Sequence, residues 1–259
     1  MDPAQTVLFL ACVALATAAQ TLTGFAFALI LLGVSSLFGL ASVADAANVA
    51  TLLSLFNAFI ALRIARGSMD LRATGDMVLG SVPGIAFGVI LLAWLSANVV
   101  AVLKLLLGIT VVVCALVVLF EAAVRQQRSP RPAFVGWGVL SGVLSGLFGT
   151  GGPPLVYHLY RQPMSVKVMR DTLVAALAVN SMVRLAMVIP AGQFSANALR
   201  LSLLAAPLVF GLSWWLERHP PRWSRKAVLR LVCVLLMLTG AALIGPAVAH
   251  LAGWEGATR

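Results

Sequence analysis

The run Leu147-Phe148-Gly149-Thr150-Gly151-Gly152-Pro153-Pro154 decides how this chain folds, because it places helix-breaking residues between two apolar stretches. Glycine and proline are poor helix formers, so a helix that enters this run ends there and another begins after it. The whole chain is 61% hydrophobic, with a mean hydropathy of +1.02. In lipid, a broken backbone is tolerated only where protein or a water-filled cavity satisfies its amides. The break therefore marks a candidate binding site.

The composition sets the fold class. Only 10% of the 259 residues are charged, and apolar segments recur along the chain. Such a sequence cannot cover a soluble globule with polar side chains, so we predict an all-α polytopic membrane protein with one membrane domain. The net charge of +10 does not indicate a nucleic-acid partner, since the basic residues stand singly or in small clusters between apolar segments.

The residues that carry metal or redox chemistry are scattered. Cys12, Cys114 and Cys233 stand alone in apolar runs, without the paired spacing of a metal or redox site. The three histidines are also dispersed, and neither His-Glu-x-x-His nor Gly-x-Ser-x-Gly occurs in the sequence. We therefore expect no metal, no cofactor and no enzymatic activity.

Six uninterrupted apolar segments are long enough to cross a bilayer. They lie near residues 43–62, 77–95, 99–120, 172–190, 199–216 and 227–250. Two further apolar regions, 6–40 and 133–160, are broken near Thr23-Gly24 and at Gly149 to Pro154. The breaks leave pieces of about 14 to 17 residues, and a 14-residue helix spans only ~21 Å of a ~30 Å hydrocarbon core.

The distribution of Lys and Arg decides whether each broken region crosses once or turns back, since short cytoplasmic loops are rich in these residues. With single crossings, the four basic clusters divide almost evenly between the two sides. With two hairpins, all thirteen basic residues of the clusters fall on one side, opposed only by Arg200 and Arg259. The clusters are Arg63/Arg66/Arg72, Arg125/Arg128/Arg131, Arg161/Lys167/Arg170 and Arg218/Arg222/Arg225/Lys226. We therefore predict two re-entrant hairpins, with both termini on the opposite side.

The two halves of the chain show signs of an internal repeat. A shift of 123 positions superposes Phe25 on Phe148, Asn48 on Asp171, Asn57 on Asn180 and Gly88 on Gly211. Each half then holds a broken or re-entrant hairpin plus three transmembrane helices, and this odd number of crossings gives the halves opposite orientations. We predict two inverted repeats, residues 1–122 and 133–259, joined by a cytoplasmic linker at 123–132. Such repeats are typical of secondary transporters, whose substrates bind where the broken segments meet.

Two motifs carry a resemblance to a known family. Thr23-Gly24-Phe25-Ala26-Phe27 and Ser145-Gly146-Leu147-Phe148-Gly149-Thr150-Gly151-Gly152-Pro153 resemble the paired motifs of the TauE/SafE sulfite exporter family, and the likeness extends over essentially the whole chain. The resemblance implies a bacterial-type inner-membrane permease for small anions such as sulfite, sulfoacetate or related sulfonates. In such a membrane, the distribution of Lys and Arg places both termini in the periplasm.

The expected function is therefore export of a small organic or inorganic anion, most simply sulfite or an organosulfonate, by alternating access around the two hairpin tips. The sequence holds no Gly-x-x-x-x-Gly-Lys-Ser/Thr phosphate loop, so an ion gradient (H⁺ or Na⁺) or the gradient of the substrate itself is expected to drive transport. The alternatives are a permease for another small anion, such as a carboxylate, and a non-catalytic integral membrane subunit. Assembly into a homo-oligomer is left open.

An oxyanion needs hydrogen-bond donors, and a glycine-rich break next to a helix N-terminus offers backbone N–H groups and positive potential. The alternative role of these glycines is close helix packing. The expected substrate-binding residues are Thr21, Thr23, Gly24, Phe25, Asn57, Gly149, Thr150, Gly151, Gly152, Asn180 and Arg184.

Several polar residues inside apolar segments keep two interpretations. The amides of Asn57 and Asn180 donate hydrogen bonds to the substrate or to the hairpin tips in one interpretation. In the other, they form hydrogen bonds from helix to helix. Lys104, Arg184 and Arg230 either extend to the headgroups or face the cavity, with Arg184 the preferred countercharge because it shares a helix with Asn180. His158 and Asp171 are the weaker candidates for ion coupling. Helix capping or ion pairing, for instance between Asp171 and Arg170, is the simpler explanation for Asp45, Asp76 and Asp171.

Overall fold

The computed structural model describes residues 3–65, 68–119, 125–219 and 225–251, and all regular secondary structure within these ranges is helical. The predicted all-α class is confirmed. The helices are α1 (Pro3–Thr23), α2 (Phe27–Leu37), α3 (Val43–Ala65), α4 (Leu71–Asn98), α5 (Val100–Leu119), α6 (Arg131–Phe148), α7 (Gly152–Tyr160), α8 (Val166–Val188), α9 (Ala196–Arg218) and α10 (Arg225–Leu251).

Five helices in the described part of the chain are long and apolar enough to cross a membrane, namely α1, α3, α4, α8 and α9. Four of them match predicted spans. α5 and α10 cover the other two, with shorter apolar segments within the described ranges, Val100–Leu116 and Leu236–Gly245. The expectation of short pieces is wrong for α1, which has 21 residues. The helix begins at Pro3, a residue well suited to a first helical position, and so reaches ~31 Å.

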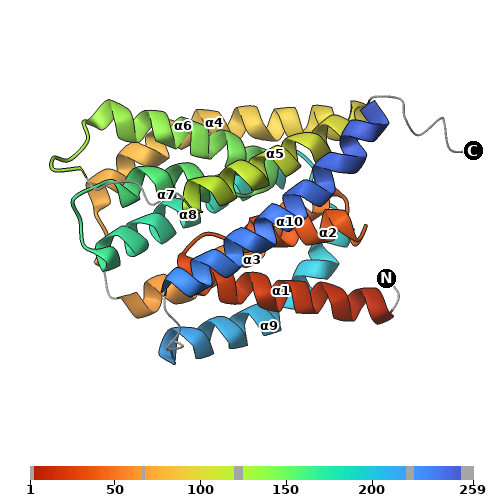
Figure 1. Ribbon diagram of the computed structural model, residues 1–259, viewed down its shortest axis with the longest axis horizontal. Coiled ribbons are helices and arrows are strands. Elements are labelled where there is room, and N and C mark those ends of the chain that lie inside the picture. Colours follow the sequence, from red (N-terminus) through yellow and green to blue (C-terminus); the bar gives the residue numbers. More distant parts are fainter. Residues whose placement is uncertain (1–2, 66–67, 120–124, 220–224, 252–259) are drawn as a thin grey trace, which may run out of the picture.

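Both breaks lie where the sequence places them. α1 ends at Thr23 before α2 begins at Phe27, and α6 ends at Phe148 before α7 begins at Gly152. Gly24 and Gly149 turn the chain with φ angles of 91° and 67°, a region that glycine enters without steric cost. Figure 1 shows α2 returning along α1 and α7 returning along α6. Each break is therefore the tip of a helical hairpin.

The described basic clusters gather at one end of the bundle. In Figure 1, the end of α3, the start of α4, the start of α6, the α7–α8 connection and the end of α9 lie on the left, and the start of α1 and the end of α10 lie on the right. Ion pairs between Arg128 and Asp70 (2.9 Å) and between Arg131 and Asp76 (2.7 Å) join the elements of this end. Outside the described residues lie Arg66, Arg222 and Arg259, and likewise the side chains of Arg225, Lys226 and Arg230.

α4 and α6 cross in direct backbone contact. Glycines recur at every fourth position on both helices, at 80, 84 and 88 on α4 and at 138, 142 and 146 on α6. A Cβ on Gly142 would lie 2.8 Å from the carbonyl carbon of Ser81. In a membrane, no hydrophobic force draws helices together. Small residues let two helices approach closely, and the resulting van der Waals packing holds them together. The second hairpin is thereby anchored on a helix of the first half.

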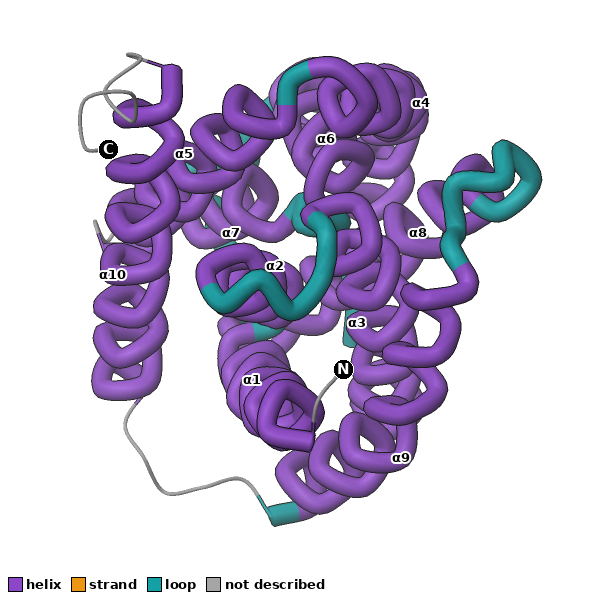
Figure 2. Tube along the Cα trace, turned by 90° about the vertical axis from the view of Figure 1, so that its right-hand side faces the viewer, coloured by secondary structure: helices purple, strands orange, loops and turns teal. Residues whose placement is uncertain are grey.

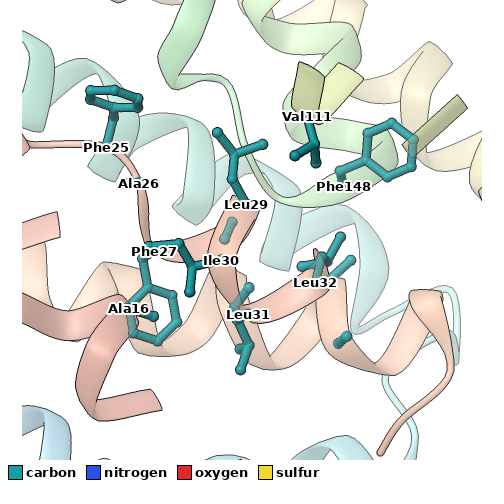
Figure 3. Packing of buried hydrophobic residues seen from close by; sticks show 14 of the residues in the cluster. Ala16, Phe25, Ala26, Phe27, Leu29, Ile30, Leu31, Leu32, Val111 and Phe148 are labelled. Atoms are coloured by element: carbon teal, nitrogen blue, oxygen red, sulfur yellow. The ribbon is translucent and has the colours of Figure 1, made fainter. Parts of the chain in front are cut away.

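α2 lies near the centre of the bundle. It contacts α1, α3, α5, α6 and α10, which surround it in Figure 2. A helix that is apolar on all sides is stable only when buried, and α2 has this character. Figure 3 shows Leu29 and Leu32 of α2 in one cluster with Val111 of α5 and Phe148, the last residue of α6. The segments next to the two tips therefore share one core.

Candidate functional site

The two hairpin tips meet at a small cavity inside the bundle. The first tip contributes Gly24 and Phe25 to its wall, and the second contributes residues 149–152. The remaining wall residues are Gln20, Ala28, Ser54, Ala58, Ser145, Val174, Leu177 and Ser181. The cavity measures about 20 Å³, and a space of this size holds about one water molecule. The cavity in this structure is therefore too small for an anion such as sulfite.

The first tip pairs the amides of Gly24 and Phe25 and the hydroxyl of Thr23 within its own hairpin, whereas no hydrogen bond within the described residues engages the amide of Ala26. The amide of Gly24 donates to the carbonyl of Gln20 at 2.6 Å, and the hydroxyl of Thr23 donates to the carbonyl of Ala19 at 2.6 Å. The amide of Phe25 in turn donates to the Thr23 hydroxyl at 3.5 Å. Gly24 and Phe25 are the residues of this tip that line the cavity.

The second tip leaves donors unpaired. The amide of Gly149 donates to the carbonyl of Ser145 at 2.8 Å. Within the described residues, no hydrogen bond engages the amides of Thr150, Gly151 or Gly152. The hydroxyl of Thr150 is buried and also has no partner there. Because buried polar groups are nearly always hydrogen-bonded, this set of donors indicates a place for a ligand.

Glycine is required at the second tip because neighbouring helices approach closely. A Cβ on Gly152 would lie 2.6 Å from the Cβ of Phe25, and one on Gly151 would lie 2.8 Å from the carbonyl oxygen of Ser141. The two tips are therefore in contact through Phe25 and Gly152. Both proposed roles of the glycines, close packing and exposed amides, occur together in the loop.

Gln20 is a cavity residue that the sequence interpretation missed. Its Nε2 donates to the carbonyl of Ser54 at 3.3 Å, and its Oε1 is buried without a partner among the described residues. Ser54, Ser145 and Ser181 were missed as well. The available signal was a glutamine in an apolar helix, one turn before the break, since polar side chains inside a membrane are usually functional.

Arg184 lies behind the second tip, outside the cavity wall. Its side chain is fully buried, so the prediction that it extends to the headgroups is wrong. Nε donates to the carbonyl of Gly146 at 3.1 Å, and Nη1 donates to Asn48 Oδ1 and Thr51 Oγ1, both at 2.9 Å. These acceptors hold the guanidinium near the C-terminus of α6, where positive charge is favourable. By contrast, Lys104 is exposed on α5.

Asn180 supports the second tip through a chain of hydrogen bonds. Ser81 donates to Asn180 Oδ1 at 2.5 Å, and Asn180 Nδ2 donates to the hydroxyl of Ser141 at 3.3 Å. Ser141 then donates to the carbonyl of Gly151 at 2.7 Å. The chain links α4, α8 and α6 to the loop, which orients Gly151 without bringing Asn180 into the cavity wall.

Asn57 supports the first hairpin in a similar way. Its Nδ2 donates to the carbonyl of Thr17 at 3.4 Å and to the hydroxyl of Thr21 at 3.3 Å. The carbonyl of Thr21 accepts a further hydrogen bond from Arg170 at 2.7 Å. The predicted residues Thr21, Thr23 and Asn57 therefore lie in the hairpin and its support, outside the cavity wall.

The two coupling candidates lie away from the cavity. His158 is buried on α7, with its ring edge-on to Phe134 at 4.5 Å between ring centroids. Asp171 accepts a hydrogen bond from Ser68 at the basic end of the bundle. The suggested pairing of Arg170 with Asp171 is wrong, because Arg170 pairs with Glu217 across to α9.

The fold and the cavity define a class of protein: a polytopic helical membrane protein in which two broken segments meet at a central polar site, as in secondary transporters. The sequence matches the family described as "Sulfite exporter TauE/SafE" over residues 8–243. The chain therefore belongs to the TauE/SafE family of membrane exporters, and the resemblance seen in its motifs is confirmed.

A curated relative agrees with the family. It is a protein of Cupriavidus necator named "Probable sulfite/organosulfonate exporter TauE", which is 36% identical over 229 residues. The matched region covers 88% of this chain and 90% of the relative. No solved structure matches the chain significantly.

Proposed function

We propose that this chain exports a small sulfur-containing anion, sulfite or an organosulfonate, by alternating access around its two hairpin tips. One observation carries the proposal: both tips meet at a cavity where the amides of residues 150–152 and the Thr150 hydroxyl have no partner among the described residues. The family and the name of the Cupriavidus relative support the choice of anion.

The chemistry of the loop favours an acceptor-rich solute. An unsatisfied polar group in an apolar interior costs several kcal/mol, so a ligand that accepts from these donors is bound preferentially. An oxyanion presents several acceptor oxygens and meets the positive potential at the start of α7. The buried guanidinium of Arg184, held on the far side of the loop, adds to that potential.

The transport cycle follows from the arrangement of two inverted repeats, residues 1–122 and 133–259, with the linker 123–132. Each hairpin packs on a helix of the other half, α1 on α9 and α6 on α4, as such a repeat requires. Because the cavity is too small for the anion in this conformation, movement of either hairpin against the opposite half opens it toward one side of the membrane. An H⁺ or Na⁺ gradient, or the anion gradient itself, drives the net flux.

The membrane orientation is part of the proposal. We place the chain in a bacterial inner membrane with its basic end in the cytoplasm and both termini in the periplasm. Cysteines at the exposed positions Gln127 and Pro163 are expected to react with an impermeant reagent only from the cytoplasm, and one at Ala191 only from the periplasm. The three natural cysteines are buried and are first replaced by serine or alanine. Labelling of Gln127→Cys and Pro163→Cys from opposite sides contradicts the second hairpin.

Transport by the purified chain tests the function. Liposomes that contain only this protein are expected to release labelled sulfite or a small sulfonate faster than empty liposomes. Absence of flux for every anion supports a non-catalytic subunit, and flux of acetate without flux of sulfite supports a carboxylate permease. A thermal-shift series with sulfite, thiosulfate, sulfonates and carboxylates ranks the same ligands independently, because binding to the folded state raises its stability.

A further inference from the structure

A second and larger hollow lies between α5, α6 and α7. It has a volume of about 510 Å³ and shares no wall residue with the cavity between the tips. We call it the amphipathic groove. Its wall consists of Ile109, Thr110, Val113, Cys114, Arg125, Trp137, Leu140, Leu144, Pro153, Pro154, Tyr157, His158 and Arg161. From Pro153 to Arg161 it follows α7 for ~12 Å toward the basic end of the bundle.

Two arginines at the basic end of the groove lack an acidic partner among the described residues. Arg125 donates to the hydroxyl of Ser129 at 3.0 Å, and Arg161 donates to the hydroxyl of Tyr157 at 2.6 Å. The amide of Arg125 also donates to the carbonyl of Arg161 at 2.9 Å, which holds the two residues side by side. By contrast, the nearby Arg128 and Arg131 each form an ion pair with an aspartate. Within the described residues, the basic end of the groove therefore carries two arginines without an acidic partner.

Two buried polar atoms also lie at this groove. His158 is 4% exposed, and its Nε2 has no hydrogen-bond partner in the described part of the chain. The Nε of Arg161 is likewise buried and unpaired there. Trp137 and Tyr157 stand beside them, with ring centroids 5.1 Å apart. Arginine with tryptophan and tyrosine is the combination found at the level of lipid headgroups.

The rest of the groove is apolar and open on the surface. Ile109, Val113 and Leu140 are 44%, 50% and 47% exposed. α5 contacts α7, whereas α5 and α6 make no extended contact in the described ranges. On a helix bundle in a bilayer, such exposed apolar side chains face the hydrocarbon. The groove is therefore open to lipid along its length and charged at its cytoplasmic end.

We propose that the amphipathic groove binds an anionic phospholipid. Its phosphate accepts hydrogen bonds from Arg125 and Arg161, and an acyl chain lies against Ile109, Val113 and Leu140. Basic pockets between transmembrane helices on the cytoplasmic side bind anionic headgroups in this manner. The volume and the apolar walls favour a lipid over a free anion, because a small anion fills only a fraction of about 510 Å³ and gains nothing from the apolar surface.

Lipid binding to the purified full-length chain tests this proposal. Dioleoylphosphatidylglycerol is expected to raise the unfolding temperature in detergent more than dioleoylphosphatidylcholine, and to remain bound in native mass spectrometry. The double variant Arg125→Gln/Arg161→Gln is expected to bind phosphatidylglycerol about tenfold more weakly, because two charge-assisted hydrogen bonds are lost. The matched control Arg72→Gln/Lys167→Gln removes the same charge from exposed positions at the same end and is expected to leave binding unchanged.

Two further measurements separate the alternatives. Val113→Trp fills the apolar part of the groove while both arginines remain, so it is expected to weaken phosphatidylglycerol binding as well. Free glycerol phosphate and sulfite, tested at the same concentrations, are expected to stabilise the protein through this groove far less than the lipid does. The proposal is overturned if both double variants lose phosphatidylglycerol binding equally. It is also overturned if a free anion raises the unfolding temperature as much as the lipid does and this rise requires Arg125 and Arg161.

Discussion

The first tip, residues 24–26, and the second tip, residues 149–151, both turn on a glycine with positive φ, at Gly24 and Gly149. They differ in what remains unpaired. The first tip uses its threonine hydroxyl and the amides of Gly24 and Phe25 within the hairpin, and Phe25 lines the cavity. The second tip leaves the amides of Thr150 and Gly151 and the Thr150 hydroxyl without partners among the described residues, and so does the amide of Gly152 at the start of α7. We therefore propose that the first tip closes the site and that the second binds the anion.

The residues that support the two tips also differ, because the second tip has a buried arginine behind it and the first has an alanine at the matched position. Asn57 and Asn180 occupy matched positions, and each bonds to the hairpin helix of its own half. Arg184 has no basic counterpart, since the matched position in the first half is Ala61. A fully buried arginine therefore lies behind the second tip, whereas the arginine that contacts the first hairpin, Arg170, is partly exposed and paired with Glu217.

Replacing Arg184 tests the support of the second tip and has the largest expected effect. Arg184→Met leaves Asn48, Thr51 and the carbonyl of Gly146 without their donor. Since each buried unpaired group costs about 1–3 kcal/mol, the loss of stability is expected to be on the order of 3 kcal/mol or more. Unfolding by denaturant in detergent measures it. Lys104→Met, an exposed basic residue in an apolar helix, is the control and is expected to change little.

The two tip glycines respond differently to a methyl group. Gly24→Ala and Gly149→Ala both force an L-residue into positive φ, at a cost of roughly 1–2 kcal/mol. At Gly149 the new Cβ also lies 2.6 Å from Thr51 Oγ1 and 2.8 Å from the carbonyl oxygen of Ala47, whereas at Gly24 the nearest atom is 3.4 Å away. We expect Gly149→Ala to be the less stable variant. If the two variants have equal free energies of unfolding, the side chain of Thr51 and the backbone of Ala47 move aside without cost, which contradicts this expectation.

The two threonines separate binding from closure. Thr150→Val removes the unpaired hydroxyl while keeping the shape of the side chain, and is expected to reduce sulfite flux in liposomes by about tenfold. Thr23→Val removes a hydroxyl that bonds only within the first tip, so flux is expected to stay close to that of the unmodified chain. A larger loss of flux from Thr23→Val than from Thr150→Val reverses the roles assigned to the tips.

The smallest effect is expected for Asn57. Its two hydrogen bonds are long, at 3.3 and 3.4 Å, and connect α3 to α1 without reaching the cavity. Asn57→Ala is therefore expected to cost about 1 kcal/mol of stability, with an unchanged thermal shift by sulfite. A loss of the sulfite-induced shift without a loss of stability contradicts a purely supporting role.

Particular residues show how far the sequence interpretation reached. Gly24, Phe25 and residues 149–152 were predicted for the site, and all of them line the cavity. Breaks in apolar helices are visible in the sequence because glycine and proline act locally. Thr21, Thr23, Asn57, Asn180 and Arg184 were predicted beside them and lie outside the cavity wall. Residue type indicates that a polar group needs a partner in lipid, but not which partner it finds.

The sequence by itself determined the helical membrane fold, the positions of both breaks and the single basic end, because composition, helix breakers and charge act along the chain. Only the tertiary structure decided that α4 and α6 cross at their glycines, that Gln20 reaches the cavity and that Arg184 turns inward. These outcomes depend on distances between helices far apart in sequence, where a few tenths of an ångström decide whether a donor meets an acceptor. The free donors of the second tip are a property of that packing.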